Sequence, residues 1–217
     1  MDSITNTQKM LVLVGSPRRK GNSATLAKAV QRGAEEVGTQ VSLRFIDDYI
    51  SSFLRDCRTC RLSDGECSIK DNFRTLFFDD FLAADGVVIC SPVYWYGLSA
   101  QIKSFFDRTF CYYAASYPNS DQVLKTMSSK RTGLVLASEE TYPGASLGII
   151  HQLQEFSRYT HSEFVGVVHG IGNSRGEVSV DPGSPVLLAE QLGREFFSRK
   201  YSDYRLDTER SKKVWPT

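Results

Sequence analysis

Five short apolar runs divide the chain, and each is continuous rather than alternating. They are residues 10–15, 41–46, 86–90, 131–137 and 163–169. Continuous apolarity is typical of strands that are buried on both faces of a sheet. Apolar residues at three- and four-residue spacing predict helices over residues 24–37, 72–84, 99–110, 145–159 and 185–199. This alternation predicts a three-layer α/β sandwich around a five-stranded parallel sheet.

Loops rich in turn residues and polar side chains follow the first, third and fourth strands, at residues 15–25, 91–97 and 138–144. The carboxyl ends of parallel strands lie at one edge of a sheet, where the ligands of such folds bind. These three loops therefore form the predicted site. Residues 112–129 show neither a continuous apolar run nor helical spacing of apolar residues, and are expected to be irregular.

The first of these loops reads GSPRRKGNSAT and leads directly into a helix. A helix N-terminus offers free backbone N–H groups and the positive end of a dipole, which suits a phosphate. Asn22 or Ser23 is expected to cap the helix. The loop has neither the GxGxxG pattern nor the Lys-Ser/Thr of a Walker loop, which favours a monophosphate. The alternative is an ordinary polar loop. The residues expected to hold the phosphate are Ser16, Arg18, Asn22, Ser23 and Ala24.

Three ordered motifs resemble the NAD(P)H-dependent FMN reductase family. They are GSPRRKGNSAT at residues 15–25, ADGVVICSPVYW at 84–95 and LSAQIKSFFDR at 98–108. The resemblance covers about residues 9–200. It implies a flavodoxin-like fold with strand order 2-1-3-4-5, FMN as cofactor and NAD(P)H as co-substrate. We expect residues 1–217 to form one FMN-binding domain with polar tails at 1–8 and 201–217.

The loop after the third strand, SPVYWYG, is expected to seat the flavin ring, a flat π-system that needs apolar or aromatic cover. The resemblance implies that Pro92, Val93, Tyr94 and Trp95 line the flavin, with backbone N–H groups near Gly97 at its polar edge. Tyr94, Trp95 and Tyr96 are also expected to line the substrate pocket.

The loop after the fourth strand is expected to hydrogen-bond the flavin or its ribityl chain. The residues expected to do so are Ser138, Glu140, Thr141 and Gly144. No side chain is expected to act as a catalyst, because hydride transfer between nicotinamide and flavin needs stacking and orientation.

Three cysteines form a compact group at Cys57, Cys60 and Cys67. Such spacing can ligate an iron–sulfur cluster or zinc. The iron–sulfur flavoproteins, a subgroup that this chain resembles, carry four cysteines here, and Leu54 stands in the slot three residues before Cys57. We therefore predict no metal. An iron–sulfur cluster, or zinc or redox-active thiols, are the alternatives.

Net charge +1 gives no electrostatic footprint for nucleic acid, and no run approaches the ~18 apolar residues of a membrane span. The start of the chain is polar and lacks the apolar stretch of a signal peptide. The five cysteines, an odd number, fit reduced thiols. These features predict a cytoplasmic protein.

Together, these observations predict an FMN-dependent NAD(P)H oxidoreductase. It would pass hydride to flavin N5 and then to a planar acceptor such as a quinone, flavin, nitro- or azo-compound, in ping-pong order. We expect a homo-oligomer, a dimer or tetramer, with the aromatic segment 105–117 as its interface. The alternative is a flavin or iron–sulfur flavin electron-transfer protein with a protein partner, although such carriers are usually strongly acidic.

Overall fold

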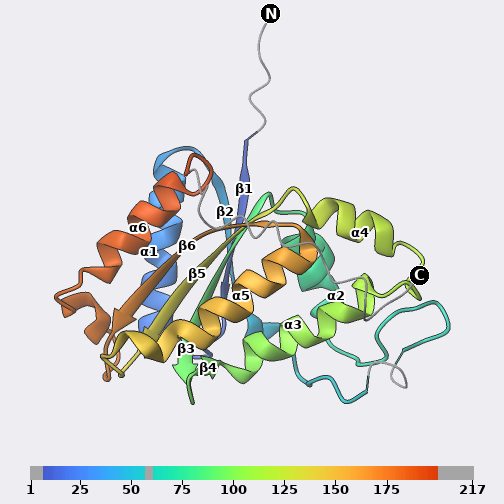
Figure 1. Cartoon of the computed structure of the whole chain (residues 1–217), viewed down its shortest axis with the longest axis horizontal. Coiled ribbons are helices and arrows are strands. Elements are labelled where there is room, and N and C mark those ends of the chain that lie inside the picture. The colour runs from blue at the N-terminus through green and yellow to red at the C-terminus, as the bar shows by residue number, and fades with distance from the viewer. Residues whose placement is uncertain (1–6, 57–60, 200–217) are drawn as a thin grey trace, which may run out of the picture.

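The computed structural model describes residues 7–56 and 61–199 and contains a parallel sheet (Figure 1). Its main strands are β1 (Lys9–Val14), β2 (Gln40–Phe45), β3 (Gly86–Tyr94), β5 (Arg131–Ser138) and β6 (Glu163–Ile171). They lie in the order β2-β1-β3-β5-β6. The short strand β4 (Gly97–Leu98) pairs antiparallel with β3. The five parallel strands therefore have the predicted order 2-1-3-4-5, and β4 is an addition.

Helices cover both faces of the sheet (Figure 1). One face carries α1 (Asn22–Glu36) and α6 (Pro185–Glu195). The other carries α2 (Phe73–Thr75), π-helical residues Leu76–Leu82, α3 (Ala100–Tyr113), α4 (Ser120–Met127) and α5 (Leu147–Thr160). Three 3₁₀ turns occur at Ile46–Asp48, Pro143–Ser146 and Glu177–Val180. Among the described residues, no helix has the length and apolarity to cross a bilayer.

Two segments expected to be loops contain regular structure. The expected loop 112–129 contains α4, because Val123 and Met127, four residues apart, turn one apolar stripe into the core. The expected loop 91–97 is instead the end of β3, a tight turn and the start of β4. The polar and aromatic composition of both segments conceals these elements, since α4 buries only Ser120, Val123 and Met127 and β4 has only two residues.

Helices α1 and α6 touch backbone to backbone. A β-carbon on Gly33 would lie 1.8 Å from the carbonyl oxygen of Glu190, and one on Gly193 would lie 2.1 Å from that of Val30. These two glycines allow an approach that any larger residue would prevent. The contact fixes α1, whose N-terminus faces the edge of the sheet where ligands are expected.

Aromatic side chains fill the core on the opposite face. The rings of Phe77 and Tyr112 stack with centroids 4.7 Å apart, and Tyr112 donates a hydrogen bond to Glu66 Oε2 (2.9 Å). Tyr112, Tyr113 and Tyr117 are all buried. Most rings of segment 105–117 are therefore used inside the subunit, and Phe110 is its exposed ring, so an oligomer interface at this segment stays a prediction. A homo-oligomer stays a prediction.

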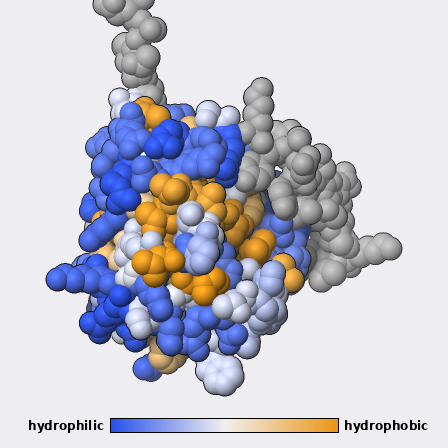
Figure 2. Space-filling view, turned by 90° about the vertical axis from the view of Figure 1, so that its left-hand side faces the viewer, coloured by the Kyte–Doolittle hydropathy of each residue, from blue (hydrophilic) through white to orange (hydrophobic). Residues whose placement is uncertain are grey.

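Exposed apolar side chains gather on α6 and on the 3₁₀ turn that precedes it. Figure 2 shows an apolar area on the face that lies at the left of Figure 1, beside α6. Val180, Leu187 and Leu188 are exposed in this part of the chain. Contiguous apolar surface often marks a contact site. This area differs from segment 105–117, where the sequence predicts the oligomer interface.

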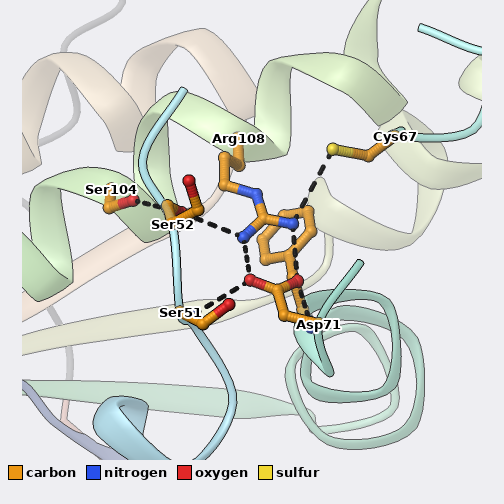
Figure 3. A network of polar contacts seen from close by, with 7 residues as sticks. Ser51, Ser52, Cys67, Asp71, Ser104 and Arg108 are labelled. Carbon is orange, nitrogen blue, oxygen red and sulfur yellow. Dashed lines mark hydrogen bonds and ion pairs between the residues drawn. The ribbon is translucent and has the colours of Figure 1, made fainter. Parts of the chain in front are cut away.

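A buried ion pair fastens the long segment between β2 and α2 to α3 (Figure 3). Arg108 is 1% exposed and donates from its two terminal nitrogens to both oxygens of Asp71, at 2.6 and 2.8 Å. It also donates to the carbonyl oxygen of Ser52 (3.2 Å) and, more weakly, to Cys67 Sγ (3.7 Å). Burial raises the pKa of Asp71, but hydrogen bonds from Arg108 and from the Ser51 N–H outweigh it and hold this pKa below its ordinary value.

Gly33→Ala tests the backbone contact between α1 and α6. The change usually stabilises an exposed helix by about 1 kcal/mol. Here we expect a loss of about 1–3 kcal/mol in the free energy of unfolding, because the methyl group meets the Glu190 carbonyl. Urea unfolding measures the difference. Lys28→Ala on an exposed position of α1 is the control and should change stability by less than about 0.5 kcal/mol. A Gly33→Ala protein as stable as the wild type would contradict the close contact.

Candidate functional site

A pocket of about 760 Å³ opens at the carboxyl edge of the sheet. Four loops line it: those after β1, β3, β5 and β6. Its size lies in the upper part of the usual range for ligand sites. The lining residues are Ser16, Arg18, Gly21, Asn22, Ser23, Pro92, Val93, Tyr94, Trp95, Tyr96, Ala137, Ser138, Glu139, Glu140, Gly172, Asn173, Ser174 and Arg175.

One end of the pocket is the N-terminus of α1. The helix starts at Asn22, and Gly21 holds the N-cap position without any side-chain hydrogen bond. The expectation that Asn22 or Ser23 caps the helix is therefore wrong. Because the cap has no side chain, the backbone N–H groups of the first turn are left for an acceptor in the pocket. With the nearby guanidinium of Arg18, this end suits an anion.

A fully buried serine lies behind this end. Ser99 Oγ donates to the carbonyl oxygen of Gly15 (2.8 Å) and accepts the N–H of Ile102 (3.4 Å), which caps α3. The N–H of Ser99 in turn donates to Ser91 Oγ (3.0 Å). A β-carbon on Gly15 would lie 2.3 Å from Ile102 Cγ1. The ends of β1 and β3 are thus held at a fixed separation.

The side chain of Asn22 holds the loop after β6 rather than capping α1. Its Nδ2 donates to the carbonyl oxygen of Gly172 (2.8 Å), and its Oδ1 accepts the N–H of Val178 (3.4 Å). Residues 172–175 were not among the predicted site residues. Their signal was present in the sequence, since the glycine-rich stretch 170–183 follows a buried strand at the same edge of the sheet.

The opposite end of the pocket is the turn between β3 and β4. Trp95 and Tyr96 have φ angles of 49° and 58°, in the left-handed region. This conformation costs a residue with a side chain roughly 1–2 kcal/mol. The side chain of Trp95 is 97% exposed. The turn therefore presents aromatic groups at the pocket mouth that the fold of the subunit does not bury.

Acidic side chains lie next to this turn. Glu139 and Glu140 line the pocket, and Tyr96 Oη donates to Glu140 Oε1 (3.5 Å). The charge of Glu140 raises the pKa of Tyr96. The pocket therefore has a basic end at α1 and an acidic, aromatic end at the β3–β4 turn. A ligand with a phosphate at one end and a flat ring at the other matches this polarity.

Beneath the loop after β5, Ser138 contacts a histidine that the sequence did not single out. Ser138 Oγ donates to the carbonyl oxygen of Glu140 (2.9 Å) and lies 2.7 Å from His169 Nε2. A hydroxyl has one proton, so we assign the Nε2–H tautomer, with His169 as donor to Ser138. Burial lowers the pKa of His169, and the charge of Asp181 opposes this in part. This pair fixes the backbone from Ser138 to Glu140.

The structure brings most of the predicted site residues together. Those that line the pocket are Ser16, Arg18, Asn22, Ser23, Pro92, Val93, Tyr94, Trp95, Tyr96, Ser138 and Glu140. Ala24, Gly97, Thr141 and Gly144 do not line it. Ala24 belongs to the first turn of α1, and its side chain is buried. Thr141 and Gly144 lie beyond the part of their loop that faces the pocket. The binding roles of all these residues stay predictions.

The predicted cysteine group lies only partly within the described residues. Cys57 and Cys60 lie outside them. Cys67 accepts a weak hydrogen bond from Arg108, and Cys111 donates to the carbonyl oxygen of Gly65 (3.3 Å). Within residues 7–56 and 61–199, no three His, Cys, Asp or Glu side chains are grouped as metal ligands.

Comparison of sequences gives a family and several relatives. The profile of a family described as NADPH-dependent FMN reductase matches residues 8–161, more than half of the chain. An iron–sulfur flavoprotein of Archaeoglobus fulgidus is 32% identical over 106 residues, 48% of this chain and 46% of that protein. YwqN of Bacillus subtilis, whose name describes it as an NAD(P)H-dependent FMN-containing oxidoreductase, is 25% identical over 174 residues. The match covers 80% of this chain and 90% of that protein.

The matches to iron–sulfur flavoproteins span about half the length of those relatives (46% to 52%). Among solved structures, an NAD(P)H:quinone oxidoreductase from Methanothermobacter marburgensis has a TM-score of 0.66 at 14% identity, over 90% of this chain and 98% of that one. At this identity, the likeness shows the flavodoxin-like fold alone.

His169→Gln tests the half-buried histidine that contacts Ser138. The pKa of His169 lies below its ordinary value of 6.5, so the unfolded chain takes up this proton first as pH falls. We expect the free energy of unfolding of the wild type to fall more steeply between about pH 7 and about pH 5 than that of His169→Gln. Urea titrations at several pH values measure both. His151→Gln, on an exposed position of α5, is the control and should follow the wild type. If the free energies of unfolding of the wild type and of His169→Gln changed in parallel with pH, the lowered pKa of His169 would be refuted.

Proposed function

The chain belongs to the NADPH-dependent FMN reductase family, and from this premise we propose that it is an FMN-dependent NAD(P)H oxidoreductase. FMN, when bound, supplies a ring that accepts hydride from NAD(P)H at N5 and gives up the electrons to a second acceptor. One observation carries the proposal. A single pocket joins the uncapped N-terminus of α1 to an exposed aromatic turn, at the edge of the sheet where such folds bind ligands.

The basic end of the pocket fits the FMN phosphate. The first-turn N–H groups of α1 supply donors and a partial positive charge, and Arg18 adds a charge-assisted hydrogen bond. The buried hydroxyl of Ser16 accepts the N–H of Arg18 (3.3 Å) and so fixes the start of the loop. Asn22 contributes through its backbone, because its side chain holds residues 172 and 178.

The other end of the pocket fits the flavin ring. Pro92 and Val93 supply apolar cover at the end of β3, and Tyr94 supplies an aromatic edge. On the facing wall, the Ser138–His169 pair holds the backbone up to Glu140 in place. These groups orient a ring and exclude water from one side of it. None is needed as an acid or base, in keeping with hydride transfer governed by stacking and distance.

Planar compounds are the proposed second substrates. Tyr94, Trp95 and Tyr96 are half or more exposed at the mouth of the pocket, where a quinone, flavin, nitro- or azo-compound would stack. Because nicotinamide and acceptor would stack at the same exposed face, they bind in turn, which is a ping-pong order. One of the solved structures with this fold is named as an NAD(P)H:quinone oxidoreductase, a name that agrees with the proposed substrate class.

An anaerobic titration tests the proposed activity. The purified protein, supplied with FMN, should show flavin absorption in the visible range. Addition of NADPH or NADH should rapidly bleach this absorption. Addition of a quinone should restore the colour. A protein that takes up no FMN would overturn the proposal. A flavoprotein that neither nicotinamide bleaches would favour an electron carrier instead.

The phosphate end is tested by the double variant Arg18→Ala, Ser23→Ala. Loss of one charged donor and one hydroxyl should weaken FMN binding by roughly tenfold or more. Quenching of flavin fluorescence on titration measures the dissociation constant. Lys20→Ala, in the same loop but outside the pocket, is the control and should bind FMN as the wild type does. Unchanged affinity in the double variant would mean that the phosphate lies elsewhere.

A second candidate function is electron transfer with a protein partner, since several relatives are named iron–sulfur flavoproteins. A cluster would need the cysteines of segment 57–67, and Leu54, three residues before Cys57, stands where the resembled subgroup has a fourth cysteine. Broad absorption beyond the flavin bands, together with bound iron, would favour this candidate. Rapid bleaching by a nicotinamide without bound iron would reject it.

A further inference from the structure

The loop after β6 brings a second arginine to the pocket. Arg175 lines the same cavity as Arg18, although the two residues come from distant parts of the chain. Both are exposed. The ion pairs found among residues 7–56 and 61–199 involve neither of them. Within the described part of the chain, two guanidinium groups therefore face one pocket without a carboxylate partner.

The loop that carries Arg175 is closed at its base. The carboxylate of Asp181 accepts the N–H groups of Ile171 (2.6 Å) and Gly183 (2.8 Å), which lie at the two ends of the loop. The N–H of Gly172 donates to the carbonyl oxygen of Ser138 (2.8 Å), at the end of β5. Both ends of the loop are thus attached, and the backbone that carries Arg175 has a fixed position at the edge of the sheet.

Asn22 holds this loop against α1. Its side chain bonds to Gly172 (2.8 Å) and to Val178 (3.4 Å), one on each side of Arg175, and Asn22 is the first residue of the helix. A β-carbon on Gly172 would lie 2.9 Å from Asn22 Nδ2, so the close approach requires glycine. Arg175 therefore belongs to the end of the pocket at α1, and not to the aromatic turn.

Glu177 occupies the N–H donors that the loop would otherwise present. Its carboxylate accepts the N–H groups of Asn173 (2.7 Å) and Ser174 (2.6 Å). Gly176, with a φ of 79°, turns the chain between Arg175 and Glu177. The guanidinium of Arg175 is therefore the group that the tip of this loop offers to an anion.

Charge decides what a second arginine adds at this end of the pocket. A phosphate monoester has a charge of about −1.5 to −2 at pH 7 and three strong acceptor oxygens. The N-terminus of α1 is equivalent to roughly +0.5, so together with Arg18 it supplies about +1.5. Arg175 is the charge that allows a dianion to be neutralised fully. The phosphate oxygens can accept two guanidinium forks as well as backbone N–H groups.

We propose that Arg175 is a second arm of the FMN phosphate site, so that the phosphate is held between α1 and the loop after β6. The inference rests on the proposed function, since it assigns a further residue to the cofactor of that site. Arg175 lies outside residues 8–161, which match the family, so this arm is additional to the phosphate loop within that match. A phosphate held from two sides makes FMN a retained cofactor rather than a flavin released after each turnover.

Riboflavin, which is FMN without its phosphate, allows a test that needs no turnover. Quenching of flavin fluorescence on titration of the full chain measures the dissociation constants of both flavins. Arg175→Ala should weaken FMN binding roughly tenfold or more and leave the weaker binding of riboflavin unchanged. Arg175→Lys should recover part of the loss, because it keeps the charge but not the planar fork.

Lys28→Ala is the control for charge alone. It removes one exposed positive charge from α1 outside the pocket and should bind FMN as the wild type does. A loss as large as that in Arg175→Ala would mean that the effect is general charge and not a contact with the phosphate, and would overturn the assignment.

Two other results would also overturn the assignment. One is an unchanged FMN affinity in Arg175→Ala. The other is an equal loss of FMN and riboflavin affinity, which would connect Arg175 with the ring or the loop and not with the phosphate. Each of these results, with FMN bound by the wild type, rejects only the role of Arg175. A wild type that takes up no FMN rejects the proposed function, and an FMN-loaded protein that neither nicotinamide bleaches rejects only the hydride transfer.

Discussion

The buried hydroxyl of Ser99 joins the elements on which the pocket depends. It connects the end of β1, through the carbonyl of Gly15, to the start of α3, and the backbone of Ser99 reaches the end of β3 through Ser91. A polar group in such a place is stable only when it is fully paired. Since every partner is itself part of a strand end or a helix start, the distance between the loop after β1 and the aromatic turn is set by the core. The pocket is therefore formed before any ligand arrives.

Asn22 extends this arrangement to the other side of the pocket. Its side chain ties α1 to both ends of the 172–178 loop, and the glycine contact between α1 and α6 prevents α1 from shifting. The exposed turn at Trp95 and Tyr96 differs, because its backbone is in a costly conformation and its rings lie in solvent. Rigid polar contacts hold the side of the pocket at α1, whereas the side at the β3–β4 turn carries conformational strain.

Much of the fold could be predicted from the sequence because the strands are buried on both faces, and continuous apolar runs mark them directly. The edge at which the site lies follows from parallel pairing. What could not be predicted depends on single contacts between distant residues. The pairing of Asn22 with Gly172 spans 150 positions, and that of Ser138 with His169 spans 31. In the aromatic segment 105–117, likewise, composition does not distinguish a ring that is buried in the subunit, such as Tyr112, from an exposed one, such as Phe110.

The ion pair between Arg108 and Asp71 decides how far the segment between β2 and α2 depends on its cysteines. Its short bonds go to a carboxylate and to a backbone carbonyl, and its contact with Cys67 is the longest of the set. Cys111 of α3 also donates to the carbonyl oxygen of Gly65 (3.3 Å), so sulfur contacts add to the attachment of the segment to α3, while the ion pair is its main part. Because the two bonds to the Asp71 carboxylate are the shortest of the set and involve no sulfur, we expect the segment to stay attached to α3 when Cys67 is replaced.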